Sequence, residues 1–141
     1  MIKLLTAAVA ILIIAVAGLG YVVFFSEHTH DHPPNPVLAK EYAKYASQHH
    51  EAGDYERAIR DYTTAIQLHP GQLFYHSWRA GTYLDFGQYQ NAIDEYTMII
   101  RLWPNASEAH HFRGEAYRAL GNITQADADQ AKACSLHSTF C

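Results

Sequence analysis

Residues 53–70 have the sequence GDYERAIRDYTTAIQLHP, and a similar stretch, GQYQNAIDEYTMIIRLWP, occupies residues 87–104. A third copy, GNITQADADQAKACSLHS, occupies residues 121–138, so that the copies follow one another at a constant interval. Each copy opens on a glycine and has an alanine at its sixth position. A constant period of about 34 residues is typical of helical hairpins that stack side by side in an array.

The same period holds at positions that suit a pair of packed helices. Small residues recur where two helix axes have to approach closely, at Ala46, Ala58, Ala80, Ala92, Gly114 and Ala126. The glycines tolerate the left-handed backbone that ends many helices. Pro70 and Pro104 stop a helix because proline cannot continue the hydrogen-bond ladder. We therefore predict two helices in each repeat, from Ala39 onward.

Each repeat shows the same order of residue types: a small residue, an aromatic, an alanine, an aromatic and a proline, with departures in the third repeat. Because of this order and the constant period, the segment from Ala39 to about Leu136 resembles three tetratricopeptide repeats. The resemblance implies an all-α solenoid of helix-turn-helix repeats at residues 39–72, 73–106 and 107–141.

The predicted core consists of apolar side chains at helical spacing, which should pack continuously between successive hairpins. Its members are Tyr62, Ile66, Tyr83, Tyr96, Ile100 and Tyr117. The third repeat departs from the pattern, with Gln130 at the aromatic position and Ser138 at the proline position. We expect its polar last helix to cap the array, because no neighbour covers it.

The resemblance also implies a concave surface lined by the first helix of each repeat, where members of this family bind partners. The positions carried over are Lys40, Ala43, Ser47, His50, Glu51, Phe74, Ser77, Gly81, Leu84, Asp85, Glu108, His111, Glu115, Arg118 and Ala119. This groove has an apolar centre and charged ends. The paired Lys and Asn residues with which some members hold a terminal carboxylate are missing, so capture of such a tail is not predicted.

The N-terminal segment, residues 1–25, is predicted to be a transmembrane signal-anchor helix. As a helix, residues 4–25 would rise about 33 Å, close to the thickness of a bilayer's hydrocarbon core. A cleaved secretory signal is the alternative, with a small-x-small pattern at residues 15–17. Lys3 precedes the apolar run and acids follow it, which places the N-terminus in the cytoplasm and the repeats on the extracytoplasmic, periplasmic side.

Residues 26–38 are predicted to be a linker, because prolines there favour extended backbone. The linker contains His28, His30 and His32 at alternate positions, which makes them weak candidates for metal ligands. An extended chain spaces such side chains about 6 to 7 Å apart and does not preorganise them. A solvated polar linker is the simpler interpretation.

Composition excludes some classes of function. The net charge of −4, with scattered basic residues, argues against binding to nucleic acid. The chain has no nucleophile elbow, phosphate loop, metal-binding histidine pair on a helix or haem-attachment motif, so we predict neither an enzyme nor a cofactor. The two cysteines, Cys134 and Cys141, form a possible disulfide in an exported domain, or else remain idle thiols.

Taken together, these features predict a membrane-anchored scaffold or adaptor that binds another protein. One alternative is an accessory structural or assembly subunit, whose membrane span packs within a larger complex while the repeats brace it. A second alternative is metal binding through the histidine-rich linker.

Overall fold

The computed structural model describes Leu12–Ile13, Val22–Val23 and residues 34–141. The chain divides into two units, Met1–Asp31 and His32–Cys141. In the first unit, strands β1 (Leu12–Ile13) and β2 (Val22–Val23) pair antiparallel, with Leu12 opposite Val23. The remainder of the span predicted at residues 4–25 lies outside the described residues. Among the helices that the structure describes, none combines the length and the apolar character needed to cross a bilayer.

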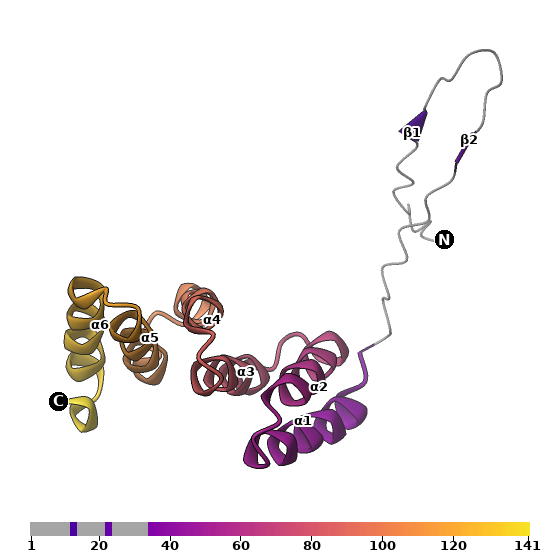
Figure 1. The fold of residues 1–141 in the computed structure, drawn as a ribbon, viewed down its shortest axis with the longest axis horizontal. Helices are drawn as coiled ribbons and strands as arrows, with labels where there is room; N and C mark the ends of the chain where they lie inside the picture. Colours follow the sequence, from indigo (N-terminus) through magenta and orange to yellow (C-terminus); the bar gives the residue numbers. More distant parts are fainter. Residues whose placement is uncertain (1–11, 14–21, 24–33) are drawn as a thin grey trace, which may run out of the picture. The chain divides into compact units, whose positions relative to one another are not determined.

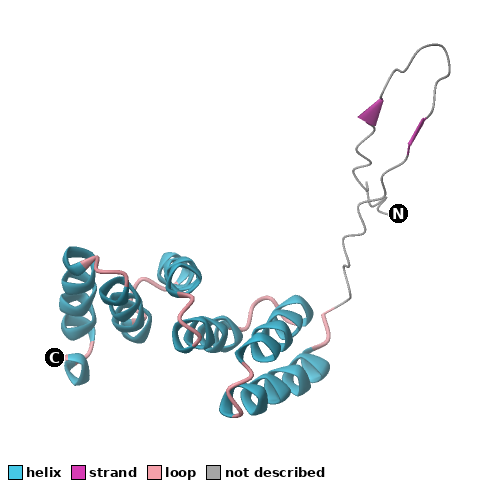
Figure 2. Cartoon of the chain, viewed as in Figure 1, coloured by secondary structure: helices cyan, strands magenta, loops and turns pink. Residues whose placement is uncertain are grey.

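The second unit is an α-solenoid of six helices that form three hairpins (Figures 1 and 2). The helices are α1 (Pro36–Glu51), α2 (Tyr55–Leu68), α3 (Leu73–Asp85), α4 (Tyr89–Leu102), α5 (Ser107–Ala119) and α6 (Ile123–Leu136). Contacts are densest within each hairpin and between consecutive helices of neighbouring hairpins. This arrangement confirms the all-α repeat fold that the constant sequence period predicts.

The tight turn inside each hairpin depends on a glycine in the left-handed region. Gly53, Gly87 and Gly121 have φ angles of 75°, 76° and 79°, which other residues adopt only with strain. After the first of these turns, the Asp54 side chain accepts a hydrogen bond from the backbone of Arg57 and caps α2. The equivalent residues before α4 and α6 make no such side-chain bond.

Helix α1 begins at Pro36, before the start at Ala39 that the repeat pattern indicates. Asn35 caps this end, because its side chain accepts a hydrogen bond from the backbone of Leu38 at 3.0 Å. Proline suits the first helical position, where its missing N–H would have no partner anyway. The predicted linker at residues 26–38 was therefore wrong at its C-terminal end.

Most buried apolar side chains form two clusters, each of which spans two successive hairpins, so the predicted core is present but divided in two. The first cluster contains Ala39, Ala43, Ala46, Tyr62, Ala65, Leu68 and Tyr75. The second contains Ala80, Ala92, Ile93, Tyr96, Ile99, Ala109 and Ala116. Many members are alanines, which let helices pack closely but bury little apolar surface. Polar contacts, described below, accompany this small apolar core.

The end of the chain folds back against the third repeat. Residues Ser138–Phe140 form a 3-10 turn, and a disulfide joins Cys134 to Cys141, with their Cα atoms 4.7 Å apart. The Phe140 ring packs against His111 with their centroids 4.8 Å apart. Its carbonyl accepts a hydrogen bond from the Gln130 side chain. The turn thus covers part of the surface that Gln130, at the aromatic position of the repeat, would otherwise leave open.

Candidate partner-binding groove

The structure distributes the predicted groove residues along α1, α3 and α5 (Figure 1). The exposed ones are Lys40, Glu51, Phe74, Asp85, Glu108, Glu115, Arg118 and Ala119. Those of intermediate burial are Ser47, His50, Ser77, Gly81, Leu84 and His111. Ala43 is only 5% exposed and belongs to the core, so it does not line the surface.

Two histidines tie groove residues together. His50 on α1 contacts α3 twice, with Nδ1 3.1 Å from Thr82 Oγ1 and Nε2 3.2 Å from Asp85 Oδ2. His111 lies 3.6 Å from Glu115, one turn further along α5. Arg118 points elsewhere, because its guanidinium contacts Asp127 on α6 at 3.0 Å.

An aromatic shelf forms on α3, in the middle of the array. The Phe74 and Trp78 rings stack with centroids 6.0 Å apart, and Trp78 also packs on Tyr62 at 6.1 Å. Both shelf residues are exposed, Phe74 by 60% and Trp78 by 49%. The sequence interpretation included Phe74 but missed Trp78. The sequence contained a signal, because Phe112 stands one repeat period after Trp78, as Tyr96 does after Tyr62. In the structure, Tyr96 and Phe112 pack together at 6.0 Å, much as Tyr62 and Trp78 do.

Two tyrosines lie beneath the groove, one in each of the first two repeats. Burial, together with the nearby charge of Glu51, raises the pKa of Tyr62 to about 12. Burial raises the pKa of Tyr96 as well, and the charges of Asp85, Glu115 and Glu108 add to the effect. Both phenols therefore stay protonated at neutral pH. Each of these tyrosines adds a polar hydroxyl to the aromatic side chains beneath the groove.

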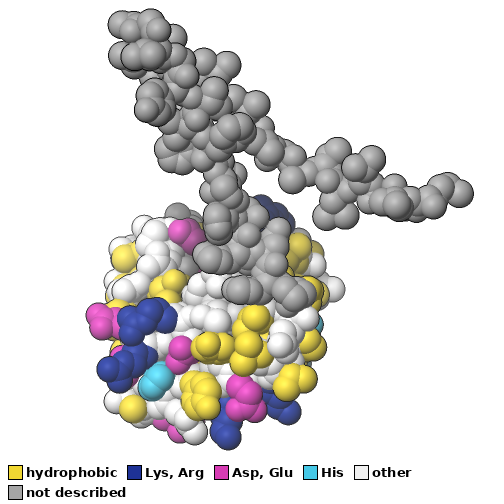
Figure 3. All heavy atoms as spheres, turned by 90° about the vertical axis from the view of Figure 1, so that its right-hand side faces the viewer, with side chains coloured by type: hydrophobic (Ala, Val, Ile, Leu, Met, Phe, Trp, Pro, Cys, Tyr) yellow, Lys and Arg dark blue, Asp and Glu magenta, His cyan; other side chains and the backbone are white. Residues whose placement is uncertain are grey.

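The surface seen from the α1–α2 end is chemically mixed. Hydrophobic side chains there alternate with basic and acidic ones (Figure 3). On α1, Val37 is 75% exposed and Tyr45 is 50% exposed. Scattered apolar residues of this kind are common on protein surfaces, so this end is a weaker candidate for a binding site than the shelf on α3.

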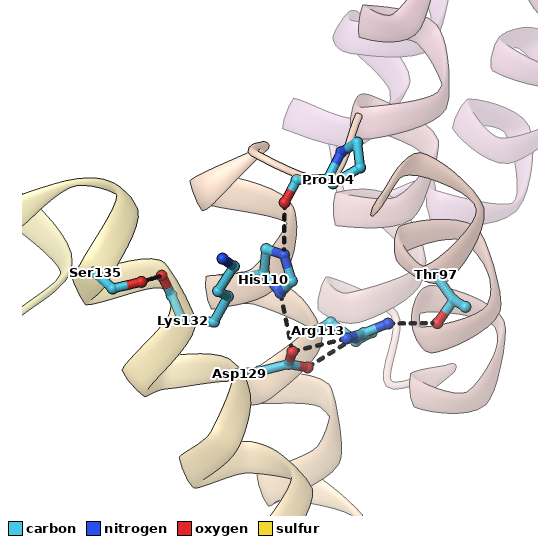
Figure 4. Close-up of polar contacts among 7 residues, drawn as sticks. All are labelled: Thr97, Pro104, His110, Arg113, Asp129, Lys132 and Ser135. Atoms are coloured by element: carbon cyan, nitrogen blue, oxygen red, sulfur yellow. Dashed lines mark hydrogen bonds and ion pairs between the residues drawn. The ribbon is translucent and has the colours of Figure 1, made fainter. Parts of the chain in front are cut away.

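A network of charged side chains links α5 and α6 (Figure 4). Arg113 forms a bidentate pair with Asp129, with Nε and Nη2 each 2.7 Å from a carboxylate oxygen. His110 Nδ1 lies 3.1 Å from the same carboxylate, and its Nε2 lies 3.2 Å from the Pro104 carbonyl. Arg113 also donates to Thr97 of the preceding repeat at 3.0 Å.

The same network occurs one repeat earlier. Arg79 donates from one nitrogen, Nη2, to both carboxylate oxygens of Glu95 at 2.9 and 2.7 Å, and its Nη1 donates to Thr63 at 2.9 Å. His76 Nδ1 lies 2.7 Å from Glu95. The sequence interpretation missed both networks, although His, Arg, acid and Thr recur at the repeat period. We call the two networks the junction clusters.

The cations control the ionisation of both junction carboxylates. Burial alone would raise the pKa of Glu95, but hydrogen bonding by His76 and the charge of Arg79 hold it below its ordinary value. Asp129 is held below its ordinary pKa in the same way, by Arg113 and His110. Since these groups are buried and mutually paired, a structural role explains them without catalysis.

No other feature of the described residues competes with the groove as a binding site. A shallow cavity of about 270 Å³ opens between α3 and α4, lined by Arg79, Tyr83, Asn91, Asp94, Glu95 and Met98. Within residues 34–141 and the two short strands, no three His, Cys, Asp or Glu side chains gather as metal ligands would. The weak metal candidates His28, His30 and His32 lie outside the described residues.

Comparison with known proteins gives a consistent result. A tetratricopeptide repeat (TPR) family model matches residues 46–107 and 79–135, which together span more than half of the chain. No curated protein sequence matches the chain. Solved structures do match it, and two of the three described next contain a bound peptide.

The second TPR domain of Spaghetti (RPAP3), bound to the HSP90 peptide SRMEEVD, is 29% identical, with a TM-score of 0.67 over 73% of this chain and 95% of that chain. The second TPR domain of human RPAP3, in complex with the HSP70 peptide SGPTIEEVD, is 28% identical, with a TM-score of 0.67 over 74% of this chain and 88% of that chain. The Arabidopsis OM64 TPR domain shares the fold at 22% identity, with a TM-score of 0.68 over 72% of this chain and 84% of that chain.

Proposed function

The chain belongs to the tetratricopeptide repeat family, and on this basis we propose that it is a scaffold that binds an extended segment of another protein. The observation that carries the proposal is the aromatic shelf of Phe74 and Trp78, which is exposed on a first helix in the middle of the array. Exposed aromatic side chains of this kind are common at the centres of protein interfaces.

The similar structures support this role. Two of them, which are 29% and 28% identical to this chain, hold the short peptides SRMEEVD and SGPTIEEVD. A solenoid can hold a segment of this kind because its neighbouring repeats create an extended surface. The bonds from Arg79 to Thr63 and from Arg113 to Thr97 hold neighbouring repeats in a fixed relation, so the groove is formed before a partner arrives.

We further propose that the scaffold is anchored in a membrane and faces an extracytoplasmic compartment. The apolar run at residues 4–25 has the length of a membrane span. The disulfide between Cys134 and Cys141 supports the compartment, since such bonds persist in oxidising surroundings. The proposed role involves no catalysis, and a structural role explains the paired ionisable groups of the junction clusters.

Photo-crosslinking in the native membrane tests the scaffold role. A photoreactive amino acid replaces Ser77 in the groove, and in a matched control it replaces Arg101, an exposed residue of the second helix of the same repeat. We expect a discrete protein adduct from position 77 and none from position 101. Equal labelling from both positions, or labelling from 101 alone, would contradict a groove that binds partners.

A second experiment tests the anchor. Carbonate extraction of membranes should leave the full chain in the pellet, and a protease added outside should digest the repeats. Replacing residues 4–25 with an unrelated membrane span should preserve the adduct at position 77. Loss of that adduct would favour the alternative in which the span itself packs within a larger complex.

A further inference from the structure

The C-terminal turn lies on the side of the third repeat where a further hairpin would pack. In the first two repeats, the tyrosine of the second helix is covered by an aromatic side chain of the next hairpin, as Trp78 covers Tyr62 with ring centroids 6.1 Å apart. Gln130 stands at the tyrosine position of the third repeat. The residue that lies against it is Phe140, whose carbonyl accepts a hydrogen bond from the Gln130 side chain. At this position, the turn replaces the contact that the next hairpin makes in the earlier repeats.

The turn also reaches a groove residue. The Phe140 ring lies on the ring of His111, with centroids 4.8 Å apart, and the Gln130 side chain connects the two residues. Its carbonyl oxygen lies 3.0 Å from His111 Nδ1, while its amide group donates to the backbone of Phe140. With Phe140 in place, the His111 side chain is 24% exposed. A partner segment that follows the groove along α5 therefore meets the turn at His111.

A disulfide decides whether the turn keeps this position. Ordering residues 137–141 costs conformational entropy at every residue, and a single helical turn is not stable by itself. One side-chain hydrogen bond and one ring contact return only part of that cost. The bond between Cys134 and Cys141 excludes many of the open conformations, because it joins residues that are 7 positions apart. Without the bond, we expect Phe140 to leave His111.

A reductant can reach this disulfide. Cys141 is exposed, and Cys134 is of intermediate burial. Exposed disulfides exchange with thiols more readily than buried ones, since a thiolate has to approach one of the two sulfurs. The bond is therefore suited to reversible opening.

We propose that this disulfide is a redox switch that controls the third-repeat end of the partner groove. In the oxidised chain, the turn holds Phe140 on His111 and closes this end. Reduction releases the turn, so that a partner segment can reach His111 and Gln130. The inference rests on the proposed scaffold function and adds its regulation.

The reductant of the switch is a dithiol, such as a protein with a pair of neighbouring cysteines. One of its thiolates attacks the Sγ atom of the exposed Cys141, and Cys134 leaves as a thiolate that takes up a proton. The second thiol of the reductant then attacks the mixed disulfide, and Cys141 leaves in the same way. Two electrons and two protons thus pass to the chain, while the dithiol becomes a disulfide.

Fluorine NMR tests the switch without any partner. 4-Fluorophenylalanine replaces Phe140 in the purified full chain in detergent. We expect the oxidised chain to give a resonance displaced by the His111 ring, and dithiothreitol to move it to the position of an unstructured peptide with the same label. In Cys134→Ser, the resonance should have the reduced position with or without dithiothreitol. The same label at Phe86, which packs on Tyr55 at the other end of the groove, should not respond.

Photo-crosslinking in the native membrane tests the control of the groove. A photoreactive amino acid replaces Glu115, an exposed groove residue one turn from His111. We expect several-fold more partner adduct after treatment with dithiothreitol than before, and the same high yield from Cys134→Ser without the reductant. Phe140→Ala, which keeps the disulfide but lacks the ring, should also raise the yield in the oxidised chain. The matched control Ser138→Ala changes an exposed residue of the same turn and should leave the yield unchanged.

The outcomes separate this inference from the scaffold function. A fluorine resonance at position 140 that stays in place when mass spectrometry shows the bond to be reduced would overturn the switch and leave the scaffold function standing. Equal adduct yields from position 115 in the oxidised and reduced chains would overturn the control of the groove in the same way. The absence of adducts from positions 77 and 115 in both states would overturn both proposals.

Discussion

The first repeat differs from the two that follow it in how its helices are held together. In the later repeats, a carboxylate of the second helix meets a histidine and an arginine of the first, and the arginine also reaches a threonine of the preceding repeat. In the first repeat, Asp61 bonds to His49 at 2.9 Å, and Tyr45 stands at the arginine position with half of its surface exposed.

The difference shows what the arginines do. Arg79 and Arg113 each connect three helices, because they bind a carboxylate within their own hairpin and a hydroxyl of the hairpin before it. The described residues include no helix before α1 that an arginine at position 45 could reach. The junction clusters thus stabilise the stacking of repeats as well as each hairpin, and four predictions test this comparison.

The largest effect is expected from Arg113→Ala. The substitution leaves the buried Asp129 without its main counter-charge, and breaking a buried pair in this way costs about 3 kcal/mol or more. Tyr45→Ala, at the same position of the first repeat, should cost less than about 1 kcal/mol, because Tyr45 is half exposed. Urea unfolding followed by circular dichroism measures both. Equal losses would show that the arginine has no special role at the junction.

Acidification should weaken both junction clusters, to a smaller extent. The pKa values of Glu95 and Asp129 lie below their ordinary values of 4.5 and 3.8 in the folded chain. Their stabilising contribution is therefore complete above about pH 4.5 and is lost as the pH falls through the lower folded-state values. The free energy of unfolding should fall accordingly. A Glu95→Gln, Asp129→Asn variant should be less stable at neutral pH and show a flatter pH profile, and an unchanged profile would contradict this origin.

Removal of the disulfide compares the two ends of the array. Cys134→Ser should lower the free energy of unfolding by about 2 kcal/mol, because the bond closes a short loop that restricts the unfolded chain and holds Phe140 on His111. A reducing agent should produce the same loss in the wild type and none in the variant. If reduction leaves the wild type unchanged, the turn at Ser138–Phe140 holds its place without the bond.

The smallest effect concerns the turns within the hairpins. Asp54→Ala removes the side-chain cap of α2 and should cost about 1 kcal/mol. Gln88→Ala and Asn122→Ala, at the equivalent positions, should cost much less, since neither side chain caps its helix. Thermal unfolding of the three variants gives the comparison, and a cost for Asn122→Ala as large as that for Asp54→Ala would be inconsistent with it.

Part of the groove follows from the repeat register, and part does not. Position in the repeat is sufficient to place Phe74, Asp85 and Glu115 on an accessible surface. It does not show that Ala43 is buried or that Trp78 extends the shelf, because these depend on the packing of the neighbouring helix.

The sequence by itself determines the hairpins, because their signals are local. A glycine that adopts a positive φ, a small residue at a close helix contact and a proline that ends a helix act within a few residues of their own position. The constant period then repeats these local turn, packing and helix-end signals along the chain. Even the start of α1 at Pro36 has a local cause, the cap at Asn35, although the repeat pattern did not reveal it.

Only the tertiary structure decides which polar groups meet. His110 and Arg113 lie on one helix and Asp129 on the next, and Thr97 belongs to another hairpin. The contact with Asp129 depends on how the two helices of one hairpin pack, and the contact with Thr97 depends on the angle at which hairpins stack. The stacking of hairpins also places His50 of α1 against Thr82 and Asp85 of α3. Charge interactions weaken with distance and are screened by solvent and salt, so the chemistry of the groove is set by this stacking and not by the repeat pattern alone.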